Sequence, residues 1–148
     1  MKTEQNFILI VGVIVLGIVL AGCHPRVDTM AKAEKIFIKM VDKAAGKLDL
    51  NGDQMAKLEQ LKVDIRKNFA EGQREKKEAL TRIKEEGLRE NPDIPKMTAI
   101  LQESLRAETG RVNKAFDLML DYQKNLNENQ KKRLGQMISE WVGKWKQT

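Results

Sequence analysis

The sequence predicts an all-α protein of about four helices, one or two of them long, arranged as a hairpin-like open bundle. Apolar residues recur at three- and four-residue steps in four segments, which is the spacing of one helix face. No segment alternates apolar and polar residues as a half-buried strand would. Aromatic residues make up only 5% of the 148-residue chain and charged residues 32%, a composition that favours extended helices over a thick globular core.

The N-terminal segment indicates export. Residues 7–20 form an apolar run after Lys2, shorter than the roughly 20 residues needed to span a bilayer, so we interpret the run as the core of a signal peptide. It leads directly into Leu20-Ala21-Gly22-Cys23, which resembles the lipobox of bacterial lipoproteins. We expect three parts: a signal peptide over 1–22, a tether over 23–28 lipidated at Cys23, and a helical domain over 29–148. An uncleaved membrane anchor is the alternative.

These features predict a lipid-anchored protein on the periplasmic side of a bacterial membrane, where nucleic acid is excluded as a partner. His24, rather than Asp, follows the cysteine, which favours the outer membrane over the inner one. Cys23 is the only cysteine, so stability must come from packing or oligomerisation rather than from an internal disulfide. The net charge of +6 suits an anionic lipid surface, an acidic client or an acidic partner.

The first two helices differ in length. The first is expected over about 28–45, with one apolar stripe and a stop at Gly46. The second is expected over about 51–89. Its stripe comprises Met55, Leu58, Leu61, Ile65 and Phe69. This helix would be roughly 58 Å long, too long for its own chain to cover. A second copy is the economical cover, so we expect a homodimer. Gly72 and Gly87 leave open whether the helix is continuous or broken.

Two further helices follow a proline-containing turn. The segment 91–95 holds two prolines and ends the second helix. The third helix is expected over about 94–124, where Glu108 interrupts the apolar stripe. The fourth is expected over about 127–144, with Trp141 and Trp145 one turn apart, which we interpret as a packing seam.

The second and fourth helices begin with the same short motif. The copies are Leu50-Asn51-Gly52-Asp53-Gln54 and Leu126-Asn127-Glu128-Asn129-Gln130. Asn51 and Asn127 are good N-caps, because their side chains accept a hydrogen bond from a free backbone N–H. Gln54 and Gln130 can reach back to the N–H of the cap residue, as in a capping box.

With this order of helices, the repeated motif resembles the Spy/CpxP family of periplasmic helical proteins, which carry two LTxxQ motifs. Asn stands here where the family usually has Thr. The resemblance covers roughly 32–145 and implies an antiparallel dimer of long helices shaped like a curved cradle. The family includes ATP-independent chaperones, inhibitors of envelope-stress sensor kinases and metal-responsive relatives. The lipid anchor departs from its best-known members, which are soluble.

We expect no enzymatic activity, cofactor or metal site. His24 is the only histidine, and neither Ser104 nor Ser139 has a histidine that could act as its base. Zinc, nickel and copper sites want histidine or thiolate ligands, which are missing from the expected helical domain.

The expected function is that of a lipid-anchored, ATP-independent chaperone and stress-response protein whose partners are unfolded or partly folded envelope proteins. One alternative is an accessory regulator that binds the periplasmic domain of a two-component sensor kinase. Another is a metal-responsive relative that has lost its ligands. The candidate client-binding surface, for which a plain solvated helix face is the alternative, comprises Lys62, Ile65, Arg66, Lys67, Phe69 and Arg74.

Overall fold

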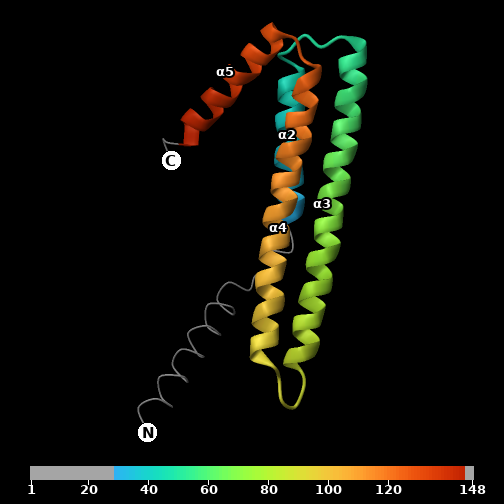
Figure 1. Ribbon diagram of the computed structural model, residues 1–148, viewed down its shortest axis with the longest axis vertical. Coiled ribbons are helices and arrows are strands. Elements are labelled where there is room, and N and C mark those ends of the chain that lie inside the picture. Colours follow the sequence, from blue (N-terminus) through green and yellow to red (C-terminus); the bar gives the residue numbers. More distant parts are fainter. Residues whose placement is uncertain (1–28, 146–148) are drawn as a thin grey trace.

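The computed structural model describes residues 29–145, which form four α-helices (Figure 1). They are α2 (Thr29–Ala45), α3 (Gly52–Gly87), α4 (Ile94–Tyr122) and α5 (Glu128–Trp145), with a 3-10 turn, η1 (Gln123–Asn125), between the last two. No strand occurs in this part of the chain, and the all-α prediction is confirmed. The predicted signal peptide (1–22), the lipidated Cys23 and its tether (23–28) lie outside the described residues, as does the side chain of Trp145.

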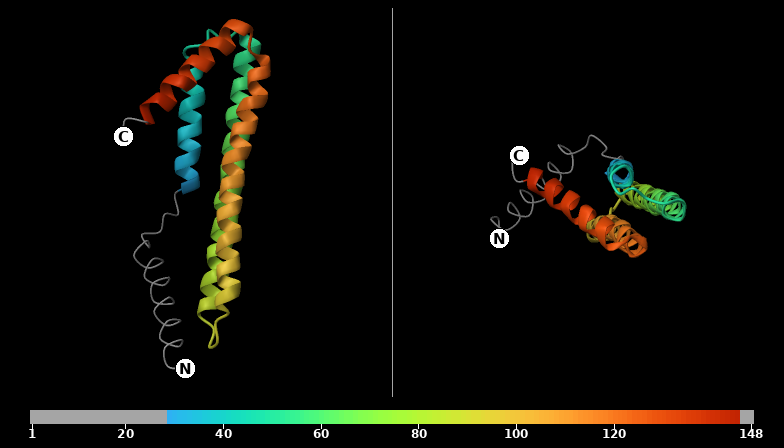
Figure 2. Two further views of the ribbon diagram at one scale, coloured as in Figure 1. Left: turned by 60° about the vertical axis from the view of Figure 1, so that its left-hand side comes forward. Right: turned by 90° about the horizontal axis from the view of Figure 1, so that it is seen from above.

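The two longest helices, α3 and α4, run antiparallel as a hairpin, and α2 packs beside the half of it that lies away from the hairpin turn (Figures 1 and 2). The turn follows from local chemistry. Asp93 caps α4 by accepting a hydrogen bond from the backbone N–H of Lys96 at 2.9 Å. Pro95 lies in the first turn of α4, where the absence of its N–H costs no hydrogen bond.

The longest helix, α3, is continuous through Gly72 and ends at Gly87, which answers the question of a break. Gly72 is buried at the place where all three packed helices meet. A Cβ atom at Gly72 would lie 3.1 Å from Cγ of Arg111 on α4 and 3.3 Å from Sδ of Met30 on α2. The glycine therefore serves close packing of neighbouring helices rather than a bend.

The apolar core lies in the half of the bundle where α2, α3 and α4 overlap. Its most deeply buried large side chains are Ile65 and Phe69, both 0% exposed. Phe37 of α2 joins the helices, because its ring packs 5.4 Å from that of Phe69 and 4.8 Å from that of Phe116 on α4. Full burial of one such side chain stabilises the fold by about 1.5–3 kcal/mol.

The expectation that α3 is too long to be covered by its own chain is wrong. Four of the five residues of the predicted stripe, Leu58, Leu61, Ile65 and Phe69, are buried under α2 and α4, whereas Met55 is 39% exposed. Beyond Gly72, α3 needs little cover, because Glu86 is its only buried residue in that half. The length of α3 therefore no longer argues for a second copy of the chain.

The last helix, α5, diverges from the bundle instead of closing it (Figures 1 and 2). Ile138 and Val142 on α5 are exposed, whereas Trp141 is half-buried. The structure thus leaves part of the apolar side of α5 uncovered, which the expected packing seam did not anticipate.

Candidate functional site

The repeated motif forms two equivalent helix caps, as the sequence predicts. The side chain of Asn51 accepts a hydrogen bond from the backbone N–H of Gln54 at 2.9 Å, and Oε1 of Gln54 accepts one from the N–H of Asn51 at 3.0 Å. Asn127 and Gln130 make the same two bonds at the same distances. Each copy is a reciprocal capping box, with Gln in the place where Glu or Gln is usual.

The two motif glutamines also bind each other, which the sequence did not reveal. Nε2 of Gln54 donates to Oε1 of Gln130 at 2.9 Å, and Nε2 of Gln130 donates to Oε1 of Gln54 at 3.0 Å. Each amide also reaches the loop before the other motif, at the carbonyl oxygen of Asn125 (2.8 Å) or of Leu48 (3.0 Å). We call this buried arrangement the glutamine clasp. It joins two helix starts that are 76 residues apart in the chain.

The surroundings of the glutamine clasp are dense and polar. The hydroxyl of Tyr122 donates to the carbonyl oxygen of Gln54 at 3.0 Å, and burial raises the pKa of this phenol. Leu126 is buried at the clasp, and Leu50 is half-buried against the core. Every polar atom of the clasp has a protein partner, so the clasp offers no free group for a ligand and its role is structural.

The candidate client-binding surface predicted on α3 is wrong as a set. Ile65 and Phe69 lie in the core and cannot touch a client. Lys62 is largely enclosed between Glu59 (2.8 Å) and Asp42 (2.9 Å), whose hydrogen bonds hold its pKa above the usual value. The remaining members, Arg66, Lys67 and Arg74, are exposed.

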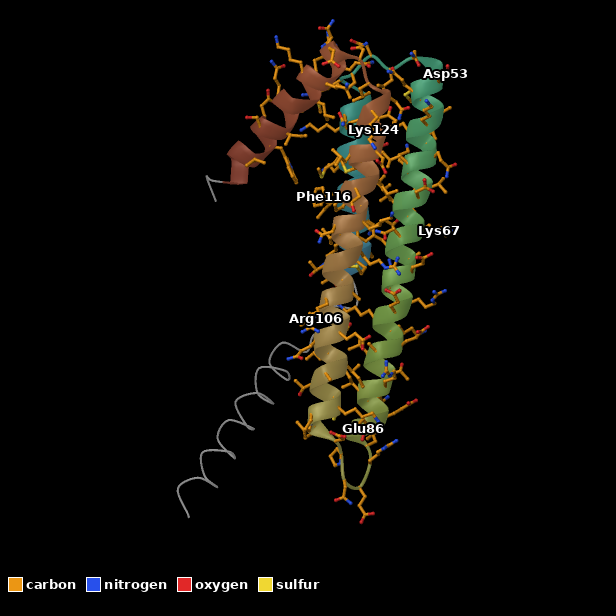
Figure 3. The ribbon with its side chains drawn as sticks, viewed as in Figure 1. Asp53, Lys67, Glu86, Arg106, Phe116 and Lys124 are labelled. Atoms are coloured by element: carbon orange, nitrogen blue, oxygen red, sulfur yellow. The ribbon has the colours of Figure 1, made fainter. Side chains whose placement is uncertain are left out.

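The physical reason is helix geometry. Successive residues of a helix are rotated by about 100°, so Arg66 and Lys67 leave the helix in other directions than Ile65. Lys67 points away from the bundle (Figure 3). Arg74 lies near Glu78, with an N–O distance of 3.8 Å, as on an ordinary solvated helix. The apolar and the basic members of the predicted surface therefore lie on different sides of α3.

The structure exposes apolar side chains on α4 instead. We define the α4 apolar face as Leu101, Leu105, Phe116 and Leu120. These residues are four or eleven positions apart, which places them along one side of the helix. Leu105 is 56% exposed and Leu120 is 60% exposed. Phe116 lies on the side of α4 toward which α5 diverges (Figure 3).

Ion pairs fix α4 against the other helices and explain the interruption of its stripe. Glu108 faces inward and receives Nζ of Lys76 at 2.8 Å and the hydroxyl of Thr29 at 3.1 Å. Arg111 donates to Glu75 and, at 2.8 Å, to Glu71, and these hydrogen bonds raise the pKa of its guanidinium. These charged groups satisfy one another, so they join helices rather than perform chemistry.

Among residues 29–145, no group of three or more His, Cys, Asp or Glu side chains is placed to hold a metal ion. No helix within these residues combines the length and the apolar character that crossing a membrane requires.

Comparison with protein-family models, with curated proteins and with solved structures finds no match for this chain.

Proposed function

We propose that the protein is an ATP-independent, chaperone-like stress-response protein of the bacterial envelope, of the kind that its repeated motif resembles. It is held at the periplasmic side of a membrane, the outer membrane being favoured, by a lipid on Cys23. Its partners are unfolded or partly folded envelope proteins. The observation that carries the proposal is the α4 apolar face, which the fold leaves open.

The form of this face suits transient binding of many sequences. Soluble monomers rarely expose large contiguous apolar patches, and those that they do expose are often functional. The α4 apolar face lies along a helix, so it offers weak contacts to extended segments rather than a fitted pocket. Arg106 on the same helix points into solvent (Figure 3). Its charge and the net charge of +6 favour encounter with acidic clients.

We also propose a homodimer. The support for it is the exposed apolar surface of α5 and not the length of α3. Ile138 and Val142 on α5 are exposed and lie on a helix that leaves its own bundle. We propose that α5 packs against a second copy, which would leave the α4 apolar face lining the inner side of a cradle. Sedimentation should give twice the monomer mass, and the double substitution Ile138→Gln/Val142→Gln should give the monomer.

The test of the chaperone function compares two double variants of residues 24–148, after circular dichroism has shown that each is helical. Leu105→Gln/Leu120→Gln changes the α4 apolar face. Leu80→Gln/Leu88→Gln makes the same chemical change at exposed leucines of the α3 helix and the turn that follows it. The unchanged domain should reduce light scattering from a denatured client diluted into buffer without ATP. The α4 variant should lose most of this effect, and the control variant should keep it.

The same measurements distinguish a chaperone from the alternative, an accessory regulator of a sensor kinase. Equal activity of the two variants would refute the assignment of the α4 apolar face. A domain that has no effect on scattering but binds the periplasmic domain of a sensor kinase would refute the chaperone proposal in favour of an accessory regulator.

A further inference from the structure

The outer side of α2 carries a row of lysines, which we call the lysine face: Lys32, Lys35, Lys39 and Lys43. They are three or four residues apart, so they lie along one side of the helix over about 16 Å. All four side chains are exposed. The side of α2 that bears Phe37 and Val41 packs into the core, so the lysine face is turned away from the hairpin.

The charge of the lysine face is not neutralised within the described part of the chain. No ion pair joins any of the four lysines to an acidic side chain there. Of the two acidic residues of α2, Glu34 is half-buried, and Asp42, at the edge of the lysine face, binds Lys62 of α3 at 2.9 Å. The lysine face therefore presents four positive charges to whatever lies beside α2.

The chain connection brings α2 close to the membrane, if Cys23 is lipidated as the proposed function holds. Six residue steps (29 − 23) separate Cys23 from Thr29. An extended chain spans at most about 3.6 Å per residue, so Thr29 can lie no farther than about 22 Å from the lipidated residue. Lys32 lies one helical turn beyond Thr29, so the lysine face begins within about 26 Å of the lipidated residue and can reach the bilayer surface.

We propose that the lysine face binds anionic phospholipid headgroups and holds α2 flat on the membrane that carries the lipid anchor. A basic cluster beside an acyl chain is a known way to strengthen and orient membrane attachment. Ile36 lies on the same side of α2 and is 53% exposed, so its side chain can reach the boundary between headgroups and acyl chains.

The residue type favours a lipid surface over an acidic protein. The lysine face contains no arginine, the residue that binds protein carboxylates through two parallel hydrogen bonds in a fixed geometry. Lysine is a point charge on a flexible stem, which suits headgroups that move laterally and have no fixed arrangement. Each lysine near an anionic bilayer surface strengthens binding about fivefold.

The experiment measures lysine reactivity in the mature chain, extracted from membranes and reconstituted on vesicles. One set of vesicles contains phosphatidylcholine alone, and the other contains phosphatidylcholine with phosphatidylglycerol. An amine reagent labels the lysines, and mass spectrometry gives the labelling rate at each. We expect labelling of the lysine face to be at least about tenfold slower on the anionic vesicles. Exposed lysines on α3, namely Lys67, Lys77 and Lys84, should react equally on both. The protection should fade as salt shortens the Debye length from about 10 Å to about 3 Å.

Two triple variants supply the matched comparison. Lys35→Glu/Lys39→Glu/Lys43→Glu should abolish the protection of Lys32 on anionic vesicles. The same charge change in Lys67→Glu/Lys77→Glu/Lys84→Glu should leave it intact.

The outcomes separate this inference from the lipid anchor on which it rests. Equal labelling of the lysine face on both kinds of vesicle, with the chain retained on both, would refute the inference and leave the anchor standing. Retention on anionic vesicles alone would support the lysine face and refute the anchor. If the chain is retained on neither kind of vesicle, both the binding of the lysine face and the lipid anchor are refuted. Protection by added polyglutamate but not by anionic vesicles would overturn the inference in favour of an acidic protein.

Discussion

Replacing Gln130 with leucine should destabilise the protein more than the same replacement of a glutamine outside the clasp, although leucine is of similar size and apolar. The Gln130 side chain makes two hydrogen bonds with Gln54, accepts one from the N–H of Asn127 and donates one to the carbonyl oxygen of Leu48. A typical intramolecular hydrogen bond contributes about 1 kcal/mol, and the substitution leaves buried partners unsatisfied. Burial of the leucine offsets part of this loss, so we expect a cost of about 3 kcal/mol.

Thermal and urea unfolding followed by circular dichroism measure this cost. A loss of about 3 kcal/mol lowers the melting temperature by roughly 10 °C or more in a domain of this size. Gln60→Leu is the control, because Gln60 is exposed and, within the described residues, its side chain binds only Asp64 on its own helix; it should change stability by less than about 0.5 kcal/mol.

A double-mutant cycle with Gln54→Leu tests the clasp itself. The two bonds between Gln54 and Gln130 are lost in either single variant, so the double variant should cost about 2 kcal/mol less than the sum of the singles. Strict additivity, or a Gln130→Leu variant as stable as Gln60→Leu, would refute the clasp.

Three further results are expected. The pKa of Glu86, which is 3% exposed, lies below its usual value of 4.5, chiefly because Lys96 donates to it at 2.6 Å. Glu86 therefore contributes stability above pH 4.5 that is lost as the pH falls through its lowered pKa, and Glu86→Gln should flatten the acid side of the stability profile measured by urea unfolding. Gly110→Ala should raise the free energy of unfolding by about 1 kcal/mol, because a Cβ there meets open space within a helix, whereas Gly72→Leu should lower it by about 1–3 kcal/mol by overpacking against Met30. Mass spectrometry of the protein extracted from membranes should show an N-terminal Cys23 with acyl chains, and a chain that retains residues 1–22 would instead support the uncleaved anchor.

Local signals in the sequence predicted the helices well, because periodicity, caps and prolines act within a few residues. Asn51 marks the start of α3, and Gly46 follows the last residue of α2, as the neighbouring sequence specifies. The reciprocal capping boxes were predictable for the same reason. The meeting of Gln54 with Gln130 was not, because it depends on how the turns between the helices bring two distant loops together.

The placement of the apolar surface could not be read from the sequence, since periodicity shows which residues share a face but not which faces are covered. Ile65 and Phe69 lie under α2 and α4, whereas Leu101 and Leu105 have the same four-residue spacing and remain exposed. The lysine face was detectable as a three- and four-residue repeat on α2. The basic residues of α3 were instead interpreted as part of a client-binding surface, because they lie beside the longest apolar stripe.

The shortness of α2 divides the hairpin into two mechanically different halves. From residue 73 to residue 110, most of which lies beyond α2, only Glu86 and Ile100 are buried. The start of α2 meets this half at Thr29, which bonds to Lys76 and Glu108. The pairing of Glu86 with Lys96 and of Lys76 with Glu108 takes the place of an apolar core there. Local opening costs least where few apolar side chains are buried, so amide hydrogen exchange should be fast near the hairpin turn and slow beside the clasp. We therefore expect the part of the hairpin near its turn to open locally while the core beside α2 stays folded.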